Sequence, residues 1–399
     1  MEGWKQIFKR TTCPVIGVVS LFISIGCGEI SELTHQPPNP PVASPAESTP
    51  AVQGKVAVIL GANFTDSTGT INVIPLQSPR TASTHLTTTH SDATVRSFSG
   101  LIYVINRKGA DNIQIIDPSD FKTVLQLSTG LATNPQDIAV VSASKAYVTL
   151  YEPEENQTPG LTVDDLLIID LSTGTIARTI DLTPFTWDDG DRFARASSLL
   201  LIDNKLYIAI QDLPGNLALR PDQPGKLLRL DTRNEQIDAA LTLECRNPFS
   251  MSTSPKTGKI FVGCADFFDL RSPYGGVEAV RIEPFETEGI FLDDLFLDGW
   301  LGDLEVSGEH GFAVVGATDY SENRIVRFSM NEENSEFTVL YRSGSYLQEI
   351  AVSDEGDLLV GDRNPEQSGV LFLDPATGAV LEGPINVGAA PSSIAFVER

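Results

Sequence analysis

The chain has 399 residues, of which 28 are Lys or Arg and 53 are Asp or Glu, so its net charge at pH 7 is −25. A chain this acidic, with no basic stripe, is not expected to bind nucleic acid, and its charge instead favours cationic partners or divalent metal ions. The length is sufficient to bury a large core.

Residues 1–26 have the organisation of an export signal. A basic segment precedes an apolar segment, residues 14–26, that is too short and wrongly flanked for a stable membrane span. The apolar segment ends in Ser24-Ile25-Gly26-Cys27, which resembles the lipobox of bacterial lipoproteins, although Ser24 stands where that family usually has Leu. The resemblance implies that Cys27 is lipidated and anchors the protein in the bacterial cell envelope, facing the periplasm or the cell surface. An ordinary secretory signal cleaved nearby is the alternative.

Residues 27–54 are rich in Pro, Ser, Thr and Ala and show no apolar period. This composition predicts a disordered or polyproline-like tether that holds the following domain away from the membrane.

Two cysteines remain after Cys13 leaves with the signal and Cys27 takes the lipid. Cys245 and Cys264 are an even pair in an oxidising compartment, so a disulfide between them is one expectation, and two free thiols in packed strands are the other.

Residues 55–399 repeat one strand-like phrase, and its six copies end 45 to 61 residues apart. This is the period of a four-stranded propeller blade. The copies are residues 112–117, 166–170, 226–231, 278–283, 324–329 and 369–374. Their apolar runs are typical of strands that are buried on both faces.

Each repeat is interpreted as four antiparallel strands, a to d, with strand a innermost. Complete repeats begin near Asp92, Pro135, Ala196, Pro248, Gly302 and Gln348. Three further strands lie before them, at residues 55–63, 70–76 and 81–88, and one lies after them, at residues 391–397. Three plus one completes a seventh blade. The sequence therefore predicts an all-β, seven-bladed β-propeller whose closing blade is shared by the N- and C-terminal strands, which removes exposed sheet edges.

The second full repeat shows the expected details. Its strands are predicted at residues 135–141, 145–152, 165–171 and 175–182. In the c–d turns, Asp170 and Asp374 are each followed four residues later by Gly. Because Asp bonds turn backbones and Gly supplies positive φ, we expect these aspartates to serve turn structure rather than function.

Two regions resemble the YVTN family of β-propeller repeats. Pro135-Gln136-Asp137-Ile138-Ala139 and the later Tyr147-Val148-Thr149 are similar to the Pro-x-x-Ile-Ala and Tyr-Val-Thr-Asn strands of that family, and residues 371–378 and 387–396 are similar too. The likeness weakens in the middle blades. It implies a propeller and, because the family is found largely in exported and surface proteins, an extracytoplasmic location; it implies little about function.

The long insertions all fall on one predicted face of the propeller, where the b–c and d–a connections gather. They are residues 152–164, 183–194, 212–224 and 265–275. One-sided insertion is typical of a binding face, although neutral drift in exposed loops is the alternative.

Six charged residues are predicted near the central axis on that face and are the candidate ligand-binding residues: Asp137, Asp303 and Glu349 near the beginnings of strands a, and Arg107, Asp362 and Arg363 near the ends of strands b. The first three are also candidate metal ligands, because Ca²⁺ accepts many oxygen ligands without strict geometry. No segment matches a Ca²⁺-loop motif, so solvated surface charge is the alternative.

The sequence lacks the usual catalytic sets, including a Gly-x-Ser-x-Gly elbow, paired metal-binding histidines and a Gly-rich phosphate loop. A non-catalytic, lipid-anchored binding or scaffold protein is therefore favoured, with a protein or a small molecule as its ligand. The alternative is a Ca²⁺-dependent, lactonase-like hydrolase in which the metal activates water and one of the carboxylates acts as base. No cofactor is expected for the binding protein, whereas the hydrolase alternative would use calcium.

Overall fold

The computed structural model describes residues 54–152, 165–187, 194–213, 223–266, 272–330 and 336–399. The predicted signal, Cys27 and most of the predicted tether lie outside these residues. Within the described ranges, no helix is long and apolar enough to cross a membrane.

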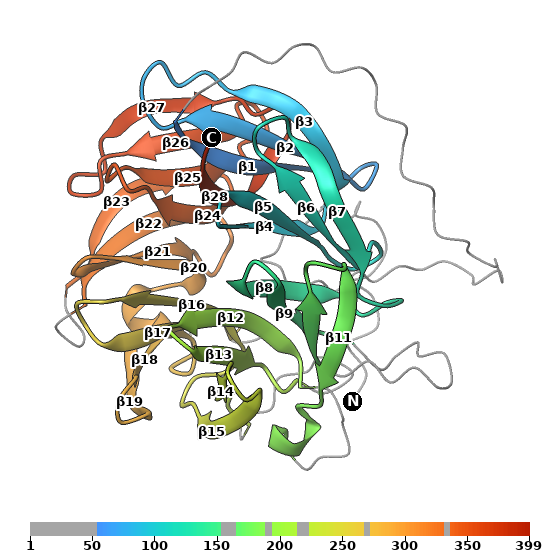
Figure 1. The fold of residues 1–399 in the computed structure, drawn as a ribbon. Helices are drawn as coiled ribbons and strands as arrows, with labels where there is room; N and C mark the ends of the chain where they lie inside the picture. Colours follow the sequence, from blue (N-terminus) through green and yellow to red (C-terminus); the bar gives the residue numbers. More distant parts are fainter. Residues whose placement is uncertain (1–53, 153–164, 188–193, 214–222, 267–271, 331–335) are drawn as a thin grey trace, which may run out of the picture. The chain divides into compact units, whose positions relative to one another are not determined.

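Across the described residues, seven four-stranded antiparallel sheets form a ring, which confirms the predicted seven-bladed β-propeller (Figure 1). The first three blades comprise β4 (Ala93–Phe98), β5 (Leu101–Asn106), β6 (Asn112–Asp117) and β7 (Lys122–Ser128); β8 (Pro135–Ser142), β9 (Lys145–Leu150), β10 (Leu166–Asp170) and β11 (Thr175–Ile180); and β12 (Ala196–Ile202), β13 (Lys205–Ile210), β14 (Lys226–Asp231) and β15 (Gln236–Thr242).

The next three blades comprise β16 (Pro248–Ser254), β17 (Lys259–Cys264), β18 (Gly276–Arg281) and β19 (Glu286–Asp293); β20 (Trp300–Ser307), β21 (His310–Gly316), β22 (Asn323–Ser329) and β23 (Thr338–Ser343); and β24 (Leu347–Val352), β25 (Leu358–Asp362), β26 (Gly369–Leu373) and β27 (Val380–Ile385). Two short helical turns, η1 (Thr183–Phe185) and α1 (Asp294–Leu297), lie between blades.

The closing blade joins the two ends of the propeller, as predicted. β28 (Ala390–Glu398) is its innermost strand and pairs antiparallel with β1 (Lys55–Asn63), which is followed outward by β2 (Thr68–Pro75) and β3 (Ser83–His90). Ile394 lies opposite Ile59, and Gly54 and Arg399 exchange backbone hydrogen bonds at 3.1 Å. The C-terminal strand therefore closes the ring as the inner strand that the N-terminal sheet lacks.

The burial of each strand follows its distance from the axis. Middle strands such as β5 and β13 are almost wholly buried, because neighbouring blades cover both of their faces. The outermost β15 alternates between exposed and half-buried residues, as a strand does when one face meets water. Buried apolar clusters fill the boundaries between neighbouring blades, including the boundary between the closing and first blades.

The turns show the predicted chemistry. Asp170 Oδ1 accepts the backbone N–H of Ser172 at 2.9 Å, and Asp374 Oδ1 accepts that of Thr377 at 2.9 Å. Gly378 has a φ of 75°, the left-handed conformation that Gly adopts most easily. These aspartates therefore serve turn structure.

The structure contains a disulfide between Cys245, which follows β15 of the third blade, and Cys264 at the end of β17 of the fourth blade, with their Cα atoms 6.1 Å apart. Glu278 Oε2 accepts the backbone N–H groups of Glu244 and Cys245 at 2.8 Å and so orients the same segment. A loop of 19 residues closed in this way contributes about 3 kcal/mol in the chain-entropy description.

The four insertions lie in the connections β9–β10, β11–β12, β13–β14 and β17–β18, which leave their blades at one face of the ring. Much of each insertion falls outside the described residues. The candidate site is therefore built from the strands and from the parts of these connections nearest to them.

Candidate functional site

Charged side chains of the innermost strands meet around the propeller axis. We call Arg96 of β4, Asp137 of β8, Asp303 and Glu305 of β20, and Glu349 of β24 the axial cluster. Arg96 Nε donates to Asp137 Oδ1 at 3.0 Å, and the charges of Glu349 and Asp303 also act on Arg96. Because β4 and β20 belong to the first and fifth blades, Arg96 and Asp303 interact across the axis. Side chains of four blades thus share one charged environment.

Three axial carboxylates also connect neighbouring blades. Each accepts the backbone N–H of a residue in the next innermost strand, so that fixed donors position it. The pairs are Asp137 with Leu199, Asp303 with Ile350, and Glu349 with Ile394, at oxygen–nitrogen distances of 3.0, 2.9 and 2.9 Å. These bonds require the strands to lie side by side, so ring closure itself fixes the carboxylates.

The negative charge of the axial cluster is incompletely neutralised. Burial raises the pKa of Asp303 to about 6, and burial together with the charge of Asp303 raises the pKa of Glu349 to about 7. Burial and the charges of Asp303 and Glu349 raise the pKa of Glu305 to about 8. Asp137 raises the pKa of Arg96, whose side chain remains 43% exposed. One exposed guanidinium is therefore shared among several carboxylates.

Arg107, a predicted ligand-binding residue, lies beside this cluster just after β5. Its side chain is 11% exposed, and its ion pair with Asp92 has a long nitrogen–oxygen distance of 3.9 Å. Burial lowers the pKa of Arg107, while the charges of Asp92, Asp137 and Glu349 oppose that shift. Burial also raises the pKa of Asp92, so neither member of this pair compensates the other fully.

The remaining two candidate ligand-binding residues, Arg363 and Asp362, have different surroundings. Arg363 Nε donates to the carbonyl oxygen of Pro391 at 2.9 Å, and the charge of Glu349 acts on Arg363, so this arginine borders the axial cluster. Asp362 instead accepts hydrogen bonds from Ser345 Oγ at 2.6 Å and from the backbone N–H of Asn364 at 2.9 Å. Its carboxylate is therefore used in the connections that flank β24 and β25.

Sequence reasoning did not single out Arg96 or Glu305, although a signal for both is present. Arg96 follows Thr94 at a spacing of two residues, and Glu305 follows Asp303 in the same way, with apolar residues between them. Because alternate residues of a strand share one face, polar alternation along an innermost strand indicates which side chains point toward the axis.

Among the described residues, no group of three or more His, Cys, Asp and Glu side chains is arranged to hold a metal ion. Asp137, Asp303 and Glu349 share the axial environment, but each is directed to a backbone donor of its own neighbour. The three histidines of the described chain lie elsewhere, His85 and His90 on the outermost β3 and His310 at the start of β21.

Comparisons with known proteins support the fold. Neither a protein-family model nor a curated protein matches the chain. A solved structure of a protein from Lactobacillus plantarum is similar with a TM-score of 0.61 and 14% identity, covering 87% of this chain and 100% of that one. Hydrazine synthase of Kuenenia stuttgartiensis is similar with a TM-score of 0.57 and 11% identity, covering 76% of this chain and 88% of that one. At these identities the likeness concerns the propeller fold alone.

Proposed function

We propose that this protein is a non-catalytic, lipid-anchored binding protein of the cell envelope that binds its ligand at the axial cluster. The observation that carries the proposal is the convergence of one arginine and four acidic side chains from four blades on the axis, where three of the acidic groups are fixed by backbone N–H groups of the next innermost strand. Ionisable groups with shifted pKa values that lie close together are a feature of functional sites. A ligand with a positively charged group would supply the basic partners that the four axial acidic groups share too few of within the protein.

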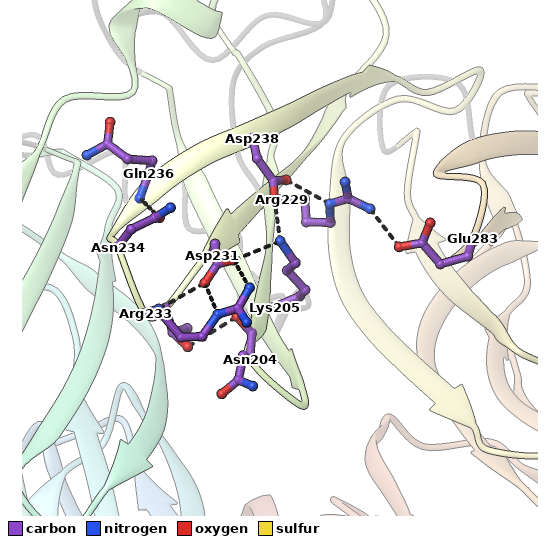
Figure 2. Close-up of polar contacts among 10 residues, drawn as sticks. Asn204, Lys205, Arg229, Asp231, Arg233, Asn234, Gln236, Asp238 and Glu283 are labelled. Atoms are coloured by element: carbon purple, nitrogen blue, oxygen red, sulfur yellow. Dashed lines mark hydrogen bonds and ion pairs between the residues drawn. The ribbon is translucent and has the colours of Figure 1, made fainter.

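A second charged cluster, at the turns of the third and fourth blades on the face away from the insertions, provides a contrast that supports this choice. We call Lys205, Arg229, Asp231, Arg233, Asp238 and Glu283 the rim cluster (Figure 2). Asp231 pairs with Arg233 and with Lys205 Nζ at 3.1 Å, and Arg229 Nε donates to Asp238 at 2.8 Å. Charges that satisfy one another in this way stabilise turns and leave little to offer a ligand.

Location outside the cytoplasm is supported by the lipobox-like segment, the Pro-rich tether and the YVTN-like repeats, and the membrane is therefore a proposed partner through the lipid on Cys27. Membrane fractionation tests this part. Cys27→Ser should move the protein from the membrane fraction to the soluble fraction, whereas Cys13→Ser, within the predicted signal, should leave it in the membrane fraction. Equal partitioning of the Cys27→Ser variant and the parent would contradict the anchor.

Thermal unfolding with a library of charged metabolites and peptides tests the binding site. A ligand of the axial cluster should raise the melting temperature of the parent and of Asp238→Asn in the rim cluster, because a ligand that binds only the folded state stabilises it. The same ligand should have a reduced effect on Asp303→Asn. A shift of equal size in all three proteins would place binding elsewhere.

Calcium belongs in the same experiment. If calcium stabilises the parent but not Asp303→Asn, the metal-dependent hydrolase becomes the better explanation, and hydrolysis of lactones should then be measured. If calcium stabilises neither protein, the metal site and the hydrolase are both rejected, while the binding proposal stands on the ligand library alone.

A further inference from the structure

We infer that the boundary between the sixth and closing blades holds a second binding site, in which Arg363 binds the carboxylate of a small monoanion and Phe64 contacts its apolar part. This site goes beyond the proposed function, because it requires no ligand at the axial cluster and takes a different class of ligand.

The site is built from strand ends that meet at one face of the ring. Arg363 directly follows β25 and Tyr346 directly precedes β24, both in the sixth blade, whereas Phe64 directly follows β1 of the closing blade. The connections β1–β2, β23–β24 and β25–β26 leave their blades at the same face as the insertions. All three residues therefore lie on the face where the sequence predicts binding.

The guanidinium group of Arg363 is positioned by both blades. It lies over two aromatic rings, with its central carbon 5.3 Å from the ring centre of Phe64 and 5.7 Å from that of Tyr346, both within the range of a cation–π contact. Its Nε donates to the carbonyl oxygen of Pro391 in β28 at 2.9 Å, and its backbone N–H donates to the carbonyl oxygen of Tyr346 at 3.0 Å. These contacts fix the orientation of the group before any ligand arrives.

The terminal nitrogens of Arg363 are not used by the described part of the chain. Among those residues, the bond to Pro391 is the one hydrogen bond of its side chain, and no carboxylate forms an ion pair with it. Four other arginines that lie over aromatic rings do pair with carboxylates: Arg80 with Asp357, Arg195 with Glu152, Arg229 with Asp238, and Arg246 with Asp266. Because the terminal N–H groups form a planar fork that matches a carboxylate in two-point contact, Arg363 presents a preformed carboxylate receptor.

Phe64 supplies the apolar part of this receptor. Its side chain is 45% exposed, although its ring adjoins a charged group. An aromatic or aliphatic group that covered the ring would be removed from water while the attached carboxylate reached Arg363. The receptor therefore favours a carboxylate that carries an apolar body over a wholly polar anion.

The charge of the protein favours a monoanion over a dianion. The net charge of the chain is −25, and the charge of Glu349 on the adjoining β24 acts on Arg363. A phosphate monoester carries a charge of about −2 at pH 7, so this field repels it more strongly than it repels a carboxylate. One arginine is therefore matched to one carboxylate.

Isothermal titration calorimetry on the full chain at pH 7 tests the inference. Benzoate and phenylacetate combine a carboxylate with an aromatic body. Acetate lacks the body, benzyl alcohol lacks the charge, and phenyl phosphate carries the larger charge. Benzoate or phenylacetate should bind at least about 10-fold more tightly than each of the other three probes, which lose one contact or meet more repulsion.

Variants locate the two contacts. Arg363→Gln should weaken binding of the tighter aromatic carboxylate by at least about 10-fold, and Phe64→Leu, which keeps an apolar side chain without the ring, by about 3-fold. The matched controls Arg233→Gln in the rim cluster and Phe296→Leu in α1 should bind as the parent does. Arg363→Lys keeps the charge without the planar fork and should also bind more weakly than the parent. It is the second variant if Arg363→Gln does not fold, with folding followed by circular dichroism.

The outcomes distinguish this site from the axial cluster. If neither aromatic carboxylate binds, or if Arg363→Gln binds it as the parent does, the site is overturned, whereas binding at the axis is tested separately through Asp303. Acetate that binds as tightly as benzoate and phenylacetate would overturn the contact with Phe64, and benzyl alcohol that does so would overturn the charge contact. Tighter binding of phenyl phosphate would overturn the carboxylate in favour of a phosphate monoester.

Discussion

The axial cluster has one basic and four acidic residues, whereas the rim cluster has three of each, and the two hold their charges in opposite ways. In the rim cluster, the hydrogen bond from Arg233 lowers the pKa of Asp231, and the hydrogen bond to Asp238 raises the pKa of Lys205. In the axial cluster, burial raises the pKa values of Asp303, Glu305 and Glu349 above their ordinary range.

The difference follows from where each cluster lies in a propeller. Side chains at the outer turns extend into water, so the long Lys and Arg side chains can adopt conformations that form ion pairs with nearby carboxylates. The innermost strands converge on the axis, so the fold brings like charges close together despite their repulsion. The rim charges pair with one another and stabilise the turns, whereas the four axial acidic groups share one arginine and are therefore the candidates for contact with a ligand.

The largest effect is expected from removing residues 391–399, because this deletes nearly all of β28 and breaks the support of the axial cluster. Ser393 accepts the N–H of Val95 at 3.1 Å and donates to Glu349 at 3.2 Å, so its loss disconnects the first and sixth blades. The exposed core and open edge should cost more than about 5 kcal/mol, which is most of the stability of a typical domain. Thermal unfolding measures this, and an unchanged melting temperature would contradict ring closure by β28.

Asp137→Ala should have the next largest effect. It leaves the buried N–H of Leu199 without its acceptor and Arg96 without its ion-pair partner, which together cost about 2–4 kcal/mol. Asp137→Asn keeps an acceptor and should be milder. In urea denaturation, Asp231→Ala in the rim cluster should reduce the free energy of unfolding less than Asp137→Ala does; a larger loss at Asp231 would reverse the comparison.

The pH dependence of stability should separate the two clusters. The folded state binds protons at Asp303, Glu305 and Glu349 more tightly than the unfolded chain does, so stability should fall as pH rises from about 5 to about 8. The rim carboxylate Asp231 has a lowered pKa. Its contribution to the stability of the folded state is therefore present above about pH 4 and is lost as the pH falls below that value. Melting temperatures should therefore be highest at mildly acidic pH.

Glu305→Gln sharpens the same comparison, because it removes the axial carboxyl group with the highest pKa. The variant should be more stable than the parent at pH 8 by about 1–2 kcal/mol and should lose most of that advantage at pH 5.5, where the parent is protonated. Thermal unfolding at several pH values checks the result. A variant less stable than the parent at pH 8 would show that the Glu305 carboxylate is compensated after all.

The smallest effect is expected from Glu283→Gln, the isosteric change in the rim cluster. Glu283 is 76% exposed and pairs with Arg229 at 3.2 Å, and such surface ion pairs contribute less than about 1 kcal/mol and weaken in salt. Chemical denaturation at low and high salt should show a small difference that disappears at high salt. A large, salt-independent loss would mean that the rim cluster is more than a set of turn contacts.

The fold was predictable to the level of single strands, including the innermost position of residues 391–397 and the turn roles of Asp170 and Asp374. The site was predictable in part. Asp137, Asp303 and Glu349 were found from their positions near the beginnings of innermost strands, but Arg96 and Glu305 were not, because the alternation along β4 and β20 was not followed to its second polar residue.

By itself, the sequence determined the strands, the turns and the number of blades, because alternation of side chains and turn chemistry act over a few residues. The tertiary structure alone decided which charges meet. Asp362 resembles Asp303 in the sequence, yet it binds its own neighbours, whereas Asp303 interacts with Arg96 of a distant blade. Electrostatic compensation depends on distances across the axis, and those distances exist only after all the blades have closed into a ring.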